Sequence, residues 1–393
     1  MYSFGDEEIE AFKKLVEKRK LFRHQGKDTE SECQLFEKEF SKHMGVSHAV
    51  ILSSGTNALF AALAAAGIGP GDEVIIPAYT FIGSASAVLL AGAIPIIANI
   101  DQSLGINPED VKNLITPQTK AIMPVHMDGL ATDLAPLKEI CREHKLTLVE
   151  DVAQAMGGNL FGQKLGSIGD FGCYSLNENK VLSCGEGGIV ISKKRKDWEH
   201  NLALHDGACV LGLTHKDSFD PPQPFLGNSM RVSEISGVLM RTQLKKLDPI
   251  LEKLRERKEA LLNAMGPLEN IAIPRGADQN GECCLSLHLL FSAPDQAMEK
   301  SKALRENKIL AYPVTARPAH ACWQWMHLFE GKASHHPALD PFNLTEKKYR
   351  YHKAMYLDSI QILSSTLKYD LDLETSVEEY QLIGKKIGEI LRS

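Results

Sequence analysis

The feature that most constrains the fold is an alternation of short apolar runs with helix-like segments between residues 49 and 151. Apolar runs typical of buried strands lie at 49–52, 73–77, 94–100, 121–125 and 146–149. Segments rich in helix formers lie between them at 58–66, 84–91 and 134–144. Strands that alternate with helices predict a mostly parallel sheet with helices on both faces. The first half of the chain is therefore expected to be an α/β domain.

The pattern changes after about residue 240. Residues 243–265 are predicted to form one long charged helix, because leucines recur there at helical spacing. A strand at 284–290 and a closing amphipathic helix at 377–391 indicate a smaller α+β unit. A chain of 393 residues is too long for a single hydrophobic core. We therefore expect a large domain at residues 1–245 and a small C-terminal domain at residues 246–393.

Composition narrows the class of protein. The net charge of −6 gives no electrostatic footprint for nucleic acid or an anionic membrane. No window offers the roughly 18 apolar residues of a membrane span, and residues 1–10 lack the apolar core of a signal peptide. The eight cysteines are scattered without a CxxC pair, which predicts free thiols in a reducing compartment and no metal site. A cytoplasmic protein is expected.

A solitary lysine, Lys180, stands in the stretch SLNENKVLSCGEGG at residues 175–188. Small polar residues surround it, and a glycine cluster then leads into an apolar run at 189–191. Glycines allow a sharp reversal of the backbone. A lysine that acts as a nucleophile must lose its proton, and a partly desolvated position lowers its pKa. Lys180 is therefore a candidate catalytic lysine.

Polar groups follow several of the predicted strands. Ser54, Gly55 and Thr56 open a predicted helix, where backbone N–H groups can hold a phosphate. His126 and Asp151 each close an apolar run. Since binding sites in parallel sheets lie at the carboxyl ends of the strands, these groups are expected to share one site.

A Schiff base between a lysine and pyridoxal phosphate requires such neighbours, namely a phosphate cup and a carboxylate for the pyridinium nitrogen. Asp151 can supply the carboxylate, and Phe81 can stack on the ring. Taken singly, each feature has a commoner role: a helix cap for Ser54, a core position for Phe81 and a structural hydrogen bond for His126. Their joint order in an α/β chain favours pyridoxal phosphate.

Five stretches resemble, in order and spacing, the DegT/DnrJ/StrS family of sugar aminotransferases: SSGTNAL, GDEVIIPAYTFIGS, EDVAQAMGG, GDFGCYSLNENKVLSCGEGGIV and NSMRVSEISGVLMRTQL. The resemblance implies a fold-type I, aspartate-aminotransferase-like architecture with pyridoxal phosphate as cofactor. It also implies a homodimer with shared active sites. The implied activity moves an amino group from a donor such as glutamate to a keto- or aldehydo-sugar.

The resemblance gives four residues roles at the cofactor ring. Lys180 would form the Schiff base and act as the catalytic acid and base. Asp151 would pair with the pyridine nitrogen. Gln154 would lie against the ring near its phenolic oxygen, and Phe81 would stack on the other face.

It gives further residues roles around the phosphate. Gly55, Thr56 and Ser175 would hold the phosphate of the same subunit's cofactor. Asn228 would reach the phosphate of the neighbouring subunit's cofactor. Arg231 lies in the same motif, where a structural role and a substrate contact are both open.

Two departures from the family pattern bear on the substrate. The approach to the lysine at 175–180 reads SLNENK instead of a SFHPxK-like sequence. The segment 312–336 lacks the pattern of nucleotide-sugar enzymes, and within it 317–329 is expected to be a long loop. VHMDG at 125–129, CGEGG at 184–188 and the tryptophans at 323–325 are similar to a branch that aminates the octulosonate sugar of lipopolysaccharide at carbon 8.

Other functions remain open. The acceptor could be a nucleotide-linked keto-sugar or a carbonyl compound that is not a sugar. A non-catalytic regulator that retains pyridoxal phosphate is the alternative from a different class. The family's dehydratases carry a histidine in place of Lys180, no cysteine is marked for a desulfurase, and residues 67–71 lack the GxGxxG spacing of a dinucleotide site.

Overall fold

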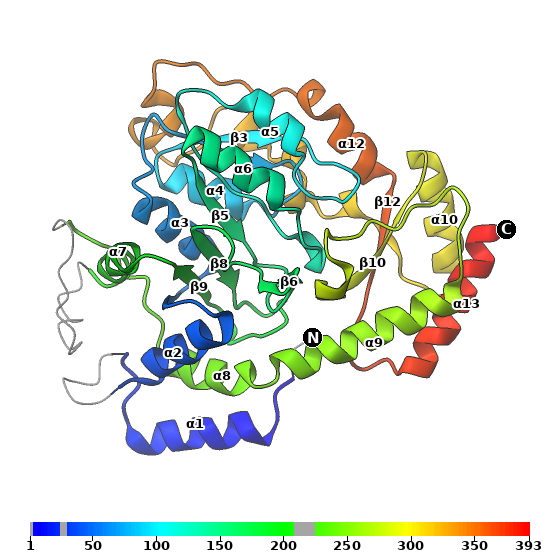
Figure 1. The fold of residues 1–393 in the computed structure, drawn as a ribbon, viewed down its shortest axis with the longest axis horizontal. Helices are drawn as coiled ribbons and strands as arrows, with labels where there is room; N and C mark the ends of the chain where they lie inside the picture. The colour runs from blue at the N-terminus through cyan, green and yellow to red at the C-terminus, as the bar shows by residue number, and fades with distance from the viewer. Residues whose placement is uncertain (1–2, 24–29, 208–224) are drawn as a thin grey trace.

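The computed structural model describes residues 3–23, 30–207 and 225–393. In this part of the chain the central element is a seven-stranded sheet with the order β1-β9-β8-β5-β4-β2-β3 (Figure 1). Its strands are β1 (His48–Leu52), β2 (Glu73–Pro77), β3 (Ile94–Ala98), β4 (Thr119–Ile122), β5 (Thr147–Asp151), β8 (Phe171–Ser175) and β9 (Gly188–Ser192). All neighbouring pairs from β3 to β8 are parallel, and β9 is antiparallel to both β1 and β8. The predicted, mostly parallel sheet is confirmed.

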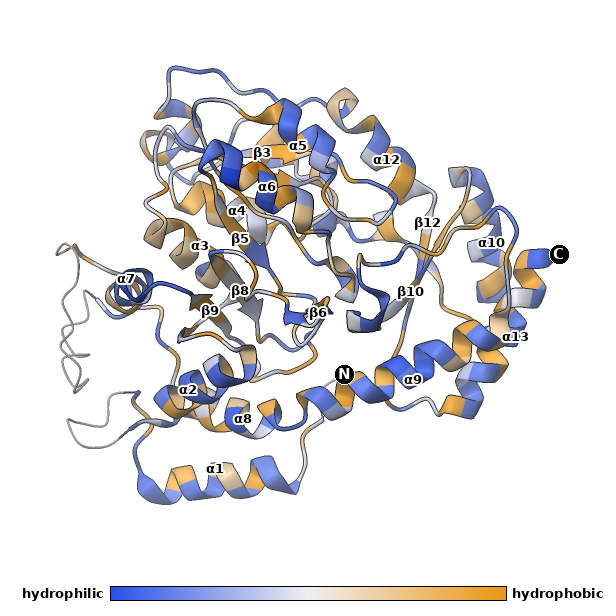
Figure 2. Cartoon of the chain, in the orientation of Figure 1, coloured by the Kyte–Doolittle hydropathy of each residue, from blue (hydrophilic) through white to orange (hydrophobic). Residues whose placement is uncertain are grey.

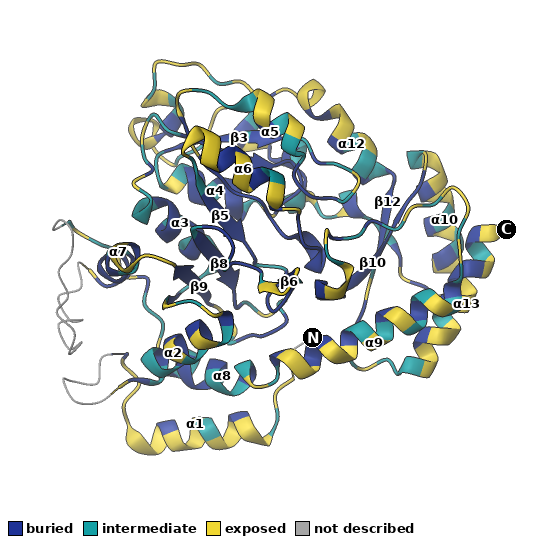
Figure 3. Ribbon diagram, in the orientation of Figure 1, coloured by how far each residue is buried: buried dark blue, intermediate teal, exposed yellow. Residues whose placement is uncertain are grey.

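Successive side chains of each strand point to opposite faces of this sheet, so both faces are apolar. Helices cover both of them. In β1, Ile51 enters one apolar cluster, and Val50 and Leu52 enter another. The first cluster includes residues of α2 (Glu32–Met44), α5 (Pro108–Leu114) and α6 (Ala135–His144), and the second those of α3 (Gly55–Ala65), α4 (Gly83–Leu90) and α7 (Arg195–His205). Figure 3 shows the strands of this sheet as a buried layer, and Figure 2 shows polar and apolar residues side by side on α2, α5 and α6.

The helices predicted between the first strands are confirmed as α3, α4 and α6, with ends that differ by a few residues. The N-terminal helices α1 (Asp6–Lys18) and α2 had no sequence prediction. None of the described helices combines the length and the apolar character needed to cross a membrane. The seven cysteines in the described ranges are free, and Cys209 lies outside those ranges.

The prediction of a single helix at 243–265 is wrong in one respect. The segment contains the end of α8 (Glu234–Leu244) and all of α9 (Leu247–Met265), and two lysines separate these helices. Pro249 lies in the first turn of α9, where its missing N–H is tolerated. Farther inside a continuous helix, its ring would clash with the carbonyl of Lys245, four residues earlier. The chain therefore begins a new helix at this point.

The C-terminal part contains a three-stranded antiparallel sheet in the order β10 (Ser286–Leu290), β12 (Thr366–Asp370), β11 (Tyr312–Pro313). The closing helix α13 (Val377–Arg392) packs along α9, as Figure 1 shows. The remaining helices of this part are α10 (Pro294–Glu306), α11 (Met326–Phe329) and α12 (Leu357–Ser364). A domain boundary near residue 245 remains a prediction.

Part of the C-terminal half returns to the large sheet. Ala321 forms a β-bridge with Tyr79 just beyond β2. The Tyr351 hydroxyl donates to the carbonyl of Pro95 in β3 at 2.7 Å. This return brings residues near position 317 to the carboxyl ends of the parallel strands.

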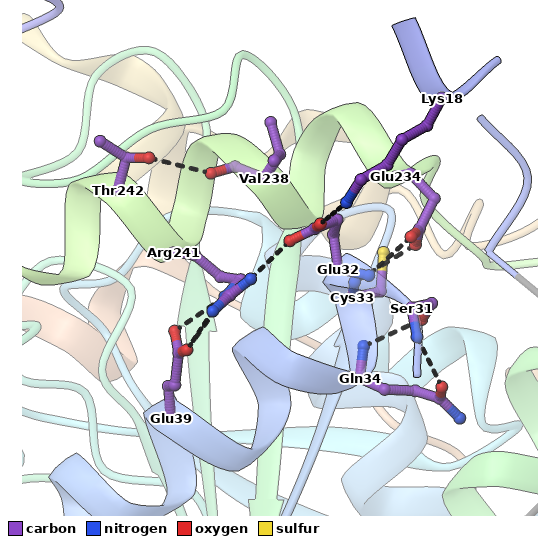
Figure 4. A network of polar contacts seen from close by, with 10 residues as sticks. All are labelled: Lys18, Ser31, Glu32, Cys33, Gln34, Glu39, Glu234, Val238, Arg241 and Thr242. Atoms are coloured by element: carbon purple, nitrogen blue, oxygen red, sulfur yellow. Dashed lines mark hydrogen bonds and ion pairs between the residues drawn. The ribbon is translucent and has the colours of Figure 1, made fainter. Parts of the chain in front are cut away.

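A polar network joins α2 to α8 (Figure 4). The Glu234 carboxylate accepts hydrogen bonds from the first backbone N–H groups of α2, those of Glu32 at 2.6 Å and Cys33 at 3.2 Å. Arg241 binds the carboxylates of Glu39 at 2.7 Å and Glu32 at 2.6 Å. Helix N–H groups without an intrahelical partner need such acceptors, so Glu234 holds the start of α2 on α8.

Candidate active site

A pocket of about 610 Å³ opens at the carboxyl ends of the parallel strands. Its wall includes most of the candidate residues from the sequence, namely Gly55, Thr56, Phe81, Asp151, Gln154, Ser175 and Lys180. The same wall contains four side chains that the sequence did not single out, namely Asp128, Arg317, His320 and Lys368. The pocket thus joins the large sheet to the C-terminal half.

The start of α3 forms one end of the pocket. Ser54 caps this helix, and its hydroxyl accepts from the N–H of Asn57 at 3.1 Å. The N–H groups of Gly55 and Thr56 occupy the first turn, where a helix offers no internal acceptor. A side chain on Gly55 would meet Cβ of Ser175 at 2.9 Å, so β8 passes directly beside this turn. A phosphate group fits this arrangement because both N–H groups and the helix dipole favour an anion.

Asp151 is the last residue of β5 and is buried. Its carboxylate accepts from the Ser84 hydroxyl at 2.8 Å and from the Ala153 N–H at 3.1 Å. Burial raises the pKa of Asp151, while these two donors and the positive charge of Lys180 oppose that rise. A buried carboxylate with few donors gains from a cationic partner, and a protonated pyridine ring would be one.

Lys180 lies in the loop between β8 and β9. Its own N–H donates to the carbonyl of Asn177 at 3.1 Å, which closes a turn. Within the described residues its Nζ forms no hydrogen bond or ion pair. Burial lowers the pKa of Lys180 and the positive charges of Arg317 and Lys368 act in the same direction, while the carboxylates of Asp151 and Asp128 oppose the shift. An amine with this pKa shift loses its proton more readily than a surface lysine, as a nucleophile must.

Two aromatic rings lie beside each other at the pocket wall. Phe81 follows β2 and is 47% exposed, so the prediction that it is available for stacking agrees with its position. Its ring centroid is 5.4 Å from that of His320. Burial lowers the pKa of His320 to about 3, and Arg317 contributes to this shift, so the imidazole is neutral near pH 7.

Gln154 joins the ring-binding residues to a second group. Its side-chain oxygen accepts from the Asp128 N–H at 3.3 Å. Asp128 is buried and adopts a left-handed backbone conformation, with φ of 51°. Its carboxylate accepts from the Tyr79 hydroxyl at 2.6 Å, from Lys368 at 2.7 Å and from Arg317 at 2.9 Å. Asp128 is thus a centre of polar contacts that the sequence analysis missed.

The signal for Asp128 was present but weak. It follows an apolar strand just as Asp151 does, within the VHMDG stretch. Its partners are too far away in the sequence to be recognised, since Arg317 lies in the segment predicted as a loop and Lys368 on β12. Only the folded chain brings them together.

His126 has the structural role that is usual for a buried histidine. Its Nδ1 accepts from the Thr132 N–H at 3.1 Å, and its Nε2 lies 3.2 Å from the Glu150 carboxylate. It is fully buried and does not line the pocket.

Asn228 lies outside the pocket wall and is exposed. Its backbone N–H donates to the carbonyl of Leu204, and its carbonyl accepts from Gly207. Arg231 forms an ion pair with the buried Asp206 and lies over the ring of Phe22. These contacts give Arg231 a structural role within the chain.

Comparison with known proteins identifies the family of the chain. The model of the DegT/DnrJ/EryC1/StrS aminotransferase family matches residues 3–349. The 3-amino-5-hydroxybenzoate synthase of Amycolatopsis mediterranei is 31% identical over 309 residues, which cover 78% of each chain. The GDP-perosamine synthase of Caulobacter vibrioides is 38% identical over 227 residues, 56% of this chain and 58% of that protein.

Solved structures agree as well. The crystal structure of 3-amino-5-hydroxybenzoic acid synthase has a TM-score of 0.80 and 25% identity, and the match covers 100% of this chain and 98% of that chain. The fold also resembles that of Helicobacter pylori PseC, an aminotransferase, with a TM-score of 0.79, 19% identity and coverage of 100% and 98%. The fold-type I architecture is confirmed by these likenesses. The chain therefore belongs to the DegT/DnrJ/EryC1/StrS family and is an aminotransferase that uses pyridoxal phosphate.

Proposed function

We propose that this aminotransferase moves an amino group from glutamate, or a similar donor, to a keto- or aldehydo-sugar. The observation that carries the proposal is Lys180, a half-buried amine without an ion-pair partner among the described residues, in one pocket with Asp151 and the start of α3. A reactive amine, an anchor for a ring nitrogen and an anchor for a phosphate are the groups that pyridoxal phosphate needs.

Several residues of this chain would hold the cofactor. Gly55, Thr56 and Ser175 would bind its phosphate, and Asp151 would keep its ring nitrogen protonated. Phe81 and Gln154 would lie on the ring. Each lines the pocket, which supports these assignments. Asn228 is proposed to reach the cofactor of a neighbouring subunit, in keeping with its exposed position outside the pocket.

When bound, pyridoxal phosphate supplies an electron sink that stabilises negative charge on the carbon next to the substrate nitrogen. Lys180 Nζ would take the proton from that carbon and later return a proton to the product. The lowered pKa of Lys180 supports this role, because the amine must be neutral to accept the proton. Asp151 would hold its charge throughout, since Ser84 and Ala153 orient the carboxylate.

We propose a surface-glycan sugar as the acceptor, and within that class the octulosonate sugar of lipopolysaccharide, aminated at carbon 8. The sequence stretches VHMDG and CGEGG and the tryptophans at 323–325 support this choice. The names of relatives point to other acceptors, such as the 2-deoxy-scyllo-inosose of the Streptomyces kanamyceticus enzyme. A nucleotide-linked keto-sugar and a non-sugar carbonyl are therefore included in the test.

We propose that the protein works as a cytoplasmic homodimer with shared active sites. The outer face of α1 supports the proposed dimer, because Ile9, Phe12 and Val16 lie there at helical spacing and are exposed. Soluble monomers rarely expose a contiguous apolar row of this kind. Figure 3 shows α1 as a mostly exposed helix at the edge of the molecule.

The test is an absorption spectrum of the purified holoenzyme before and after addition of glutamate. We expect the long-wavelength band of the lysine-linked cofactor to give way to the shorter-wavelength band of the amine form. Each candidate acceptor is then ranked by how fast it restores the first band. Lys180→Ala is the control and should abolish turnover.

Other results of these measurements would favour a different function or a different role for Lys180. A cofactor band that responds to no amino donor would support the non-catalytic regulator. A Lys180→Ala protein that transaminates at the wild-type rate would exclude the proposed role of Lys180.

A further inference from the structure

The wall of the pocket contributed by the C-terminal half carries two cations. Arg317 Nη1 donates to Asp128 at 2.9 and 3.2 Å, and Lys368 Nζ donates to the same carboxylate at 2.7 Å. Tyr79 and His288 also lie at hydrogen-bond distance from it, at 2.6 and 3.3 Å. Asp128 therefore has four side-chain partners and fixes the position of both cations.

Arg317 uses only part of its donor capacity. Its contacts with Asp128 and, at 3.5 Å, with Tyr79 all involve Nη1. Within the described residues, Nε and Nη2 form no hydrogen bond. The Arg317 side chain is 19% exposed and lines the pocket. A guanidinium offers five N–H donors in a rigid fork that matches the two oxygens of a carboxylate.

The charges around Arg317 form one connected set. The two cations, Arg317 and Lys368, share one buried carboxylate, Asp128. Lys368 has a second acidic partner, Asp370, which is half-exposed and also accepts from the Tyr312 hydroxyl at 2.7 Å. Among the described residues, Arg317 therefore has Asp128 as its acidic partner and shares it with Lys368.

We propose that Arg317 binds a carboxylate of the sugar acceptor, so that the acceptor is a sugar acid. Lys368 and Asp128 are positioning residues that hold the guanidinium in place. This inference rests on the proposed transfer to a sugar.

Two observations favour this ligand. Nε and Nη2 of Arg317 form no hydrogen bond within the described residues, and this edge of a guanidinium pairs with the two oxygens of a carboxylate. Arg317 lies in the segment 312–336, where the sequence departs from the family pattern. The acceptor differs among the named relatives, so a departing segment is expected to bind the acceptor.

The test compares a matched pair of probes, D-glucuronate and its neutral amide, D-glucuronamide, on the holoenzyme. Calorimetric titration gives the dissociation constant of each. We expect wild type to bind the acid about 10-fold or more tightly than the amide, because a charge-assisted hydrogen bond contributes that much. Arg317→Gln should bring the ratio close to one. Arg317→Lys should keep part of the preference, since it retains the charge without the fork.

Two controls separate binding of the acceptor from binding of the donor and from a general loss of positive charge. The dissociation constant of glutamate, taken from the concentration dependence of its half-reaction, should rise less in Arg317→Gln than that of D-glucuronate if the donor carboxylate binds elsewhere. Arg142→Gln is the matched surface control, since Arg142 is exposed on α6 and pairs with Glu139. It should leave the ratio of acid to amide unchanged. Should Arg317→Gln fail to fold, Arg317→Lys alone decides, and an unchanged ratio would refute the proposal.

The proposal is overturned if wild type binds both probes alike, or if Arg317→Gln keeps the wild-type ratio. It is also overturned if the variant loses only the glutamate half-reaction, because Arg317 would then serve the donor. Failure of the proposed function has a different signature, since wild type would respond to no amino donor whatever its preference for the acid.

Discussion

At the residue scale, Asp151 shows how burial prepares a single group for one partner. It lies at the end of β5, and within the described part of the chain the Ser84 hydroxyl and the Ala153 N–H are its hydrogen-bond donors. Burial raises the pKa of Asp151 in spite of these two donors. The protonated pyridine nitrogen of the cofactor would supply a cation that favours the charged form of the carboxylate.

Asp151→Asn should fold and still bind pyridoxal phosphate, because the two side chains have the same shape. Turnover should fall by about 100-fold or more, since an amide cannot hold the protonated ring that withdraws electrons. The rate of the glutamate half-reaction measures the loss. Ser84→Ala is the graded control and should cost about 5-fold, the effect of one neutral hydrogen bond. Equal rates in Asp151→Asn and wild type would contradict the assignment.

At the element scale, the backbone at the start of β9 lies very close to the backbone at the start of α3. A Cβ added to Gly188 would lie 2.2 Å from the Ser54 carbonyl oxygen and 2.6 Å from the Gly55 nitrogen. Real Cβ atoms do not come so near to backbone atoms, so the strand would have to move. The glycine cluster noted in the sequence thus has a packing function beside the phosphate-binding turn.

Gly188→Ala should therefore weaken cofactor binding by about 10-fold or more, because it displaces the N–H groups of that turn. The dissociation constant of pyridoxal phosphate for the apoprotein is the measurement. Gly187→Ala is the matched control, since its nearest neighbours are side-chain atoms of Cys184 at 3.1 Å and Leu176 at 3.3 Å. Similar constants for both variants would refute the role of Gly188.

The network of Figure 4 makes a second prediction at this scale. Glu234→Ala leaves the N–H groups of Glu32 and Cys33 without their acceptor, which should lower the free energy of unfolding by about 1–2 kcal/mol. Urea denaturation followed by circular dichroism measures it. Thr242→Ala removes only a helix back-bond and should change stability much less. A loss no larger than that of Thr242→Ala would show that the α2 cap is not important.

Sequence reasoning worked for elements and for local motifs. The alternation of apolar runs predicted five strands of the large sheet, and residues at the carboxyl ends of four of them, β1, β2, β4 and β5, line the pocket, although His126 does not. It failed where distant contacts decide the structure. The segment 317–329, predicted as a long loop, forms short helical turns, and Trp325 is buried there against α3 and α4. No periodicity reveals such turns, because tertiary packing holds them.

The charged wall of the pocket could not be predicted for a related reason. Asp128, Arg317 and Lys368 lie on three separate segments, and each looks like an ordinary surface charge in the sequence. Their mutual burial arises only when β12 and the segment after β11 meet the large sheet. Lys180 and Asp151 could be recognised from the sequence because their neighbours in sequence are also neighbours in the fold.

At the scale of the whole molecule, Asp128 connects the large sheet to the C-terminal half. Burial opposes its ionisation, but Lys368, His288 and Arg317 together lower its pKa well below the usual range. An acid with a lowered pKa in the folded state stabilises the protein above its unfolded pKa of about 4. That stabilisation is lost as the pH falls through the folded pKa.

Asp128→Asn should accordingly lower the free energy of unfolding by about 3 kcal/mol or more near pH 7, because two buried cations lose their counter-charge. The difference from wild type should narrow as the pH falls below about 4. Urea titrations across this range measure both. Asp133→Asn is the control, since Asp133 is an exposed residue at the start of α6 and should give little change at any pH. A difference that is independent of pH would contradict the predicted pKa shift.

The proposed dimer makes a further prediction. Ile9→Glu places a charge in the exposed apolar row of α1 and should shift the protein toward the monomer in analytical ultracentrifugation. Lys14→Glu introduces the same side chain at an exposed polar position about 140° around the helix from Ile9 and should leave the dimer intact. Wild-type protein that sediments as a monomer would refute the dimer itself.

The two walls of the pocket come from different stretches of the chain. Apart from Asn228, the residues proposed to hold the cofactor lie between residues 55 and 180, whereas the charged wall combines Asp128 from that stretch with Tyr312, Arg317 and Lys368 from a later one. Substitutions in the later stretch can therefore change the accepted compound while the earlier stretch keeps its chemistry. A laboratory chimera that exchanges only the later stretch between two family members would be a direct route to aminating a new sugar.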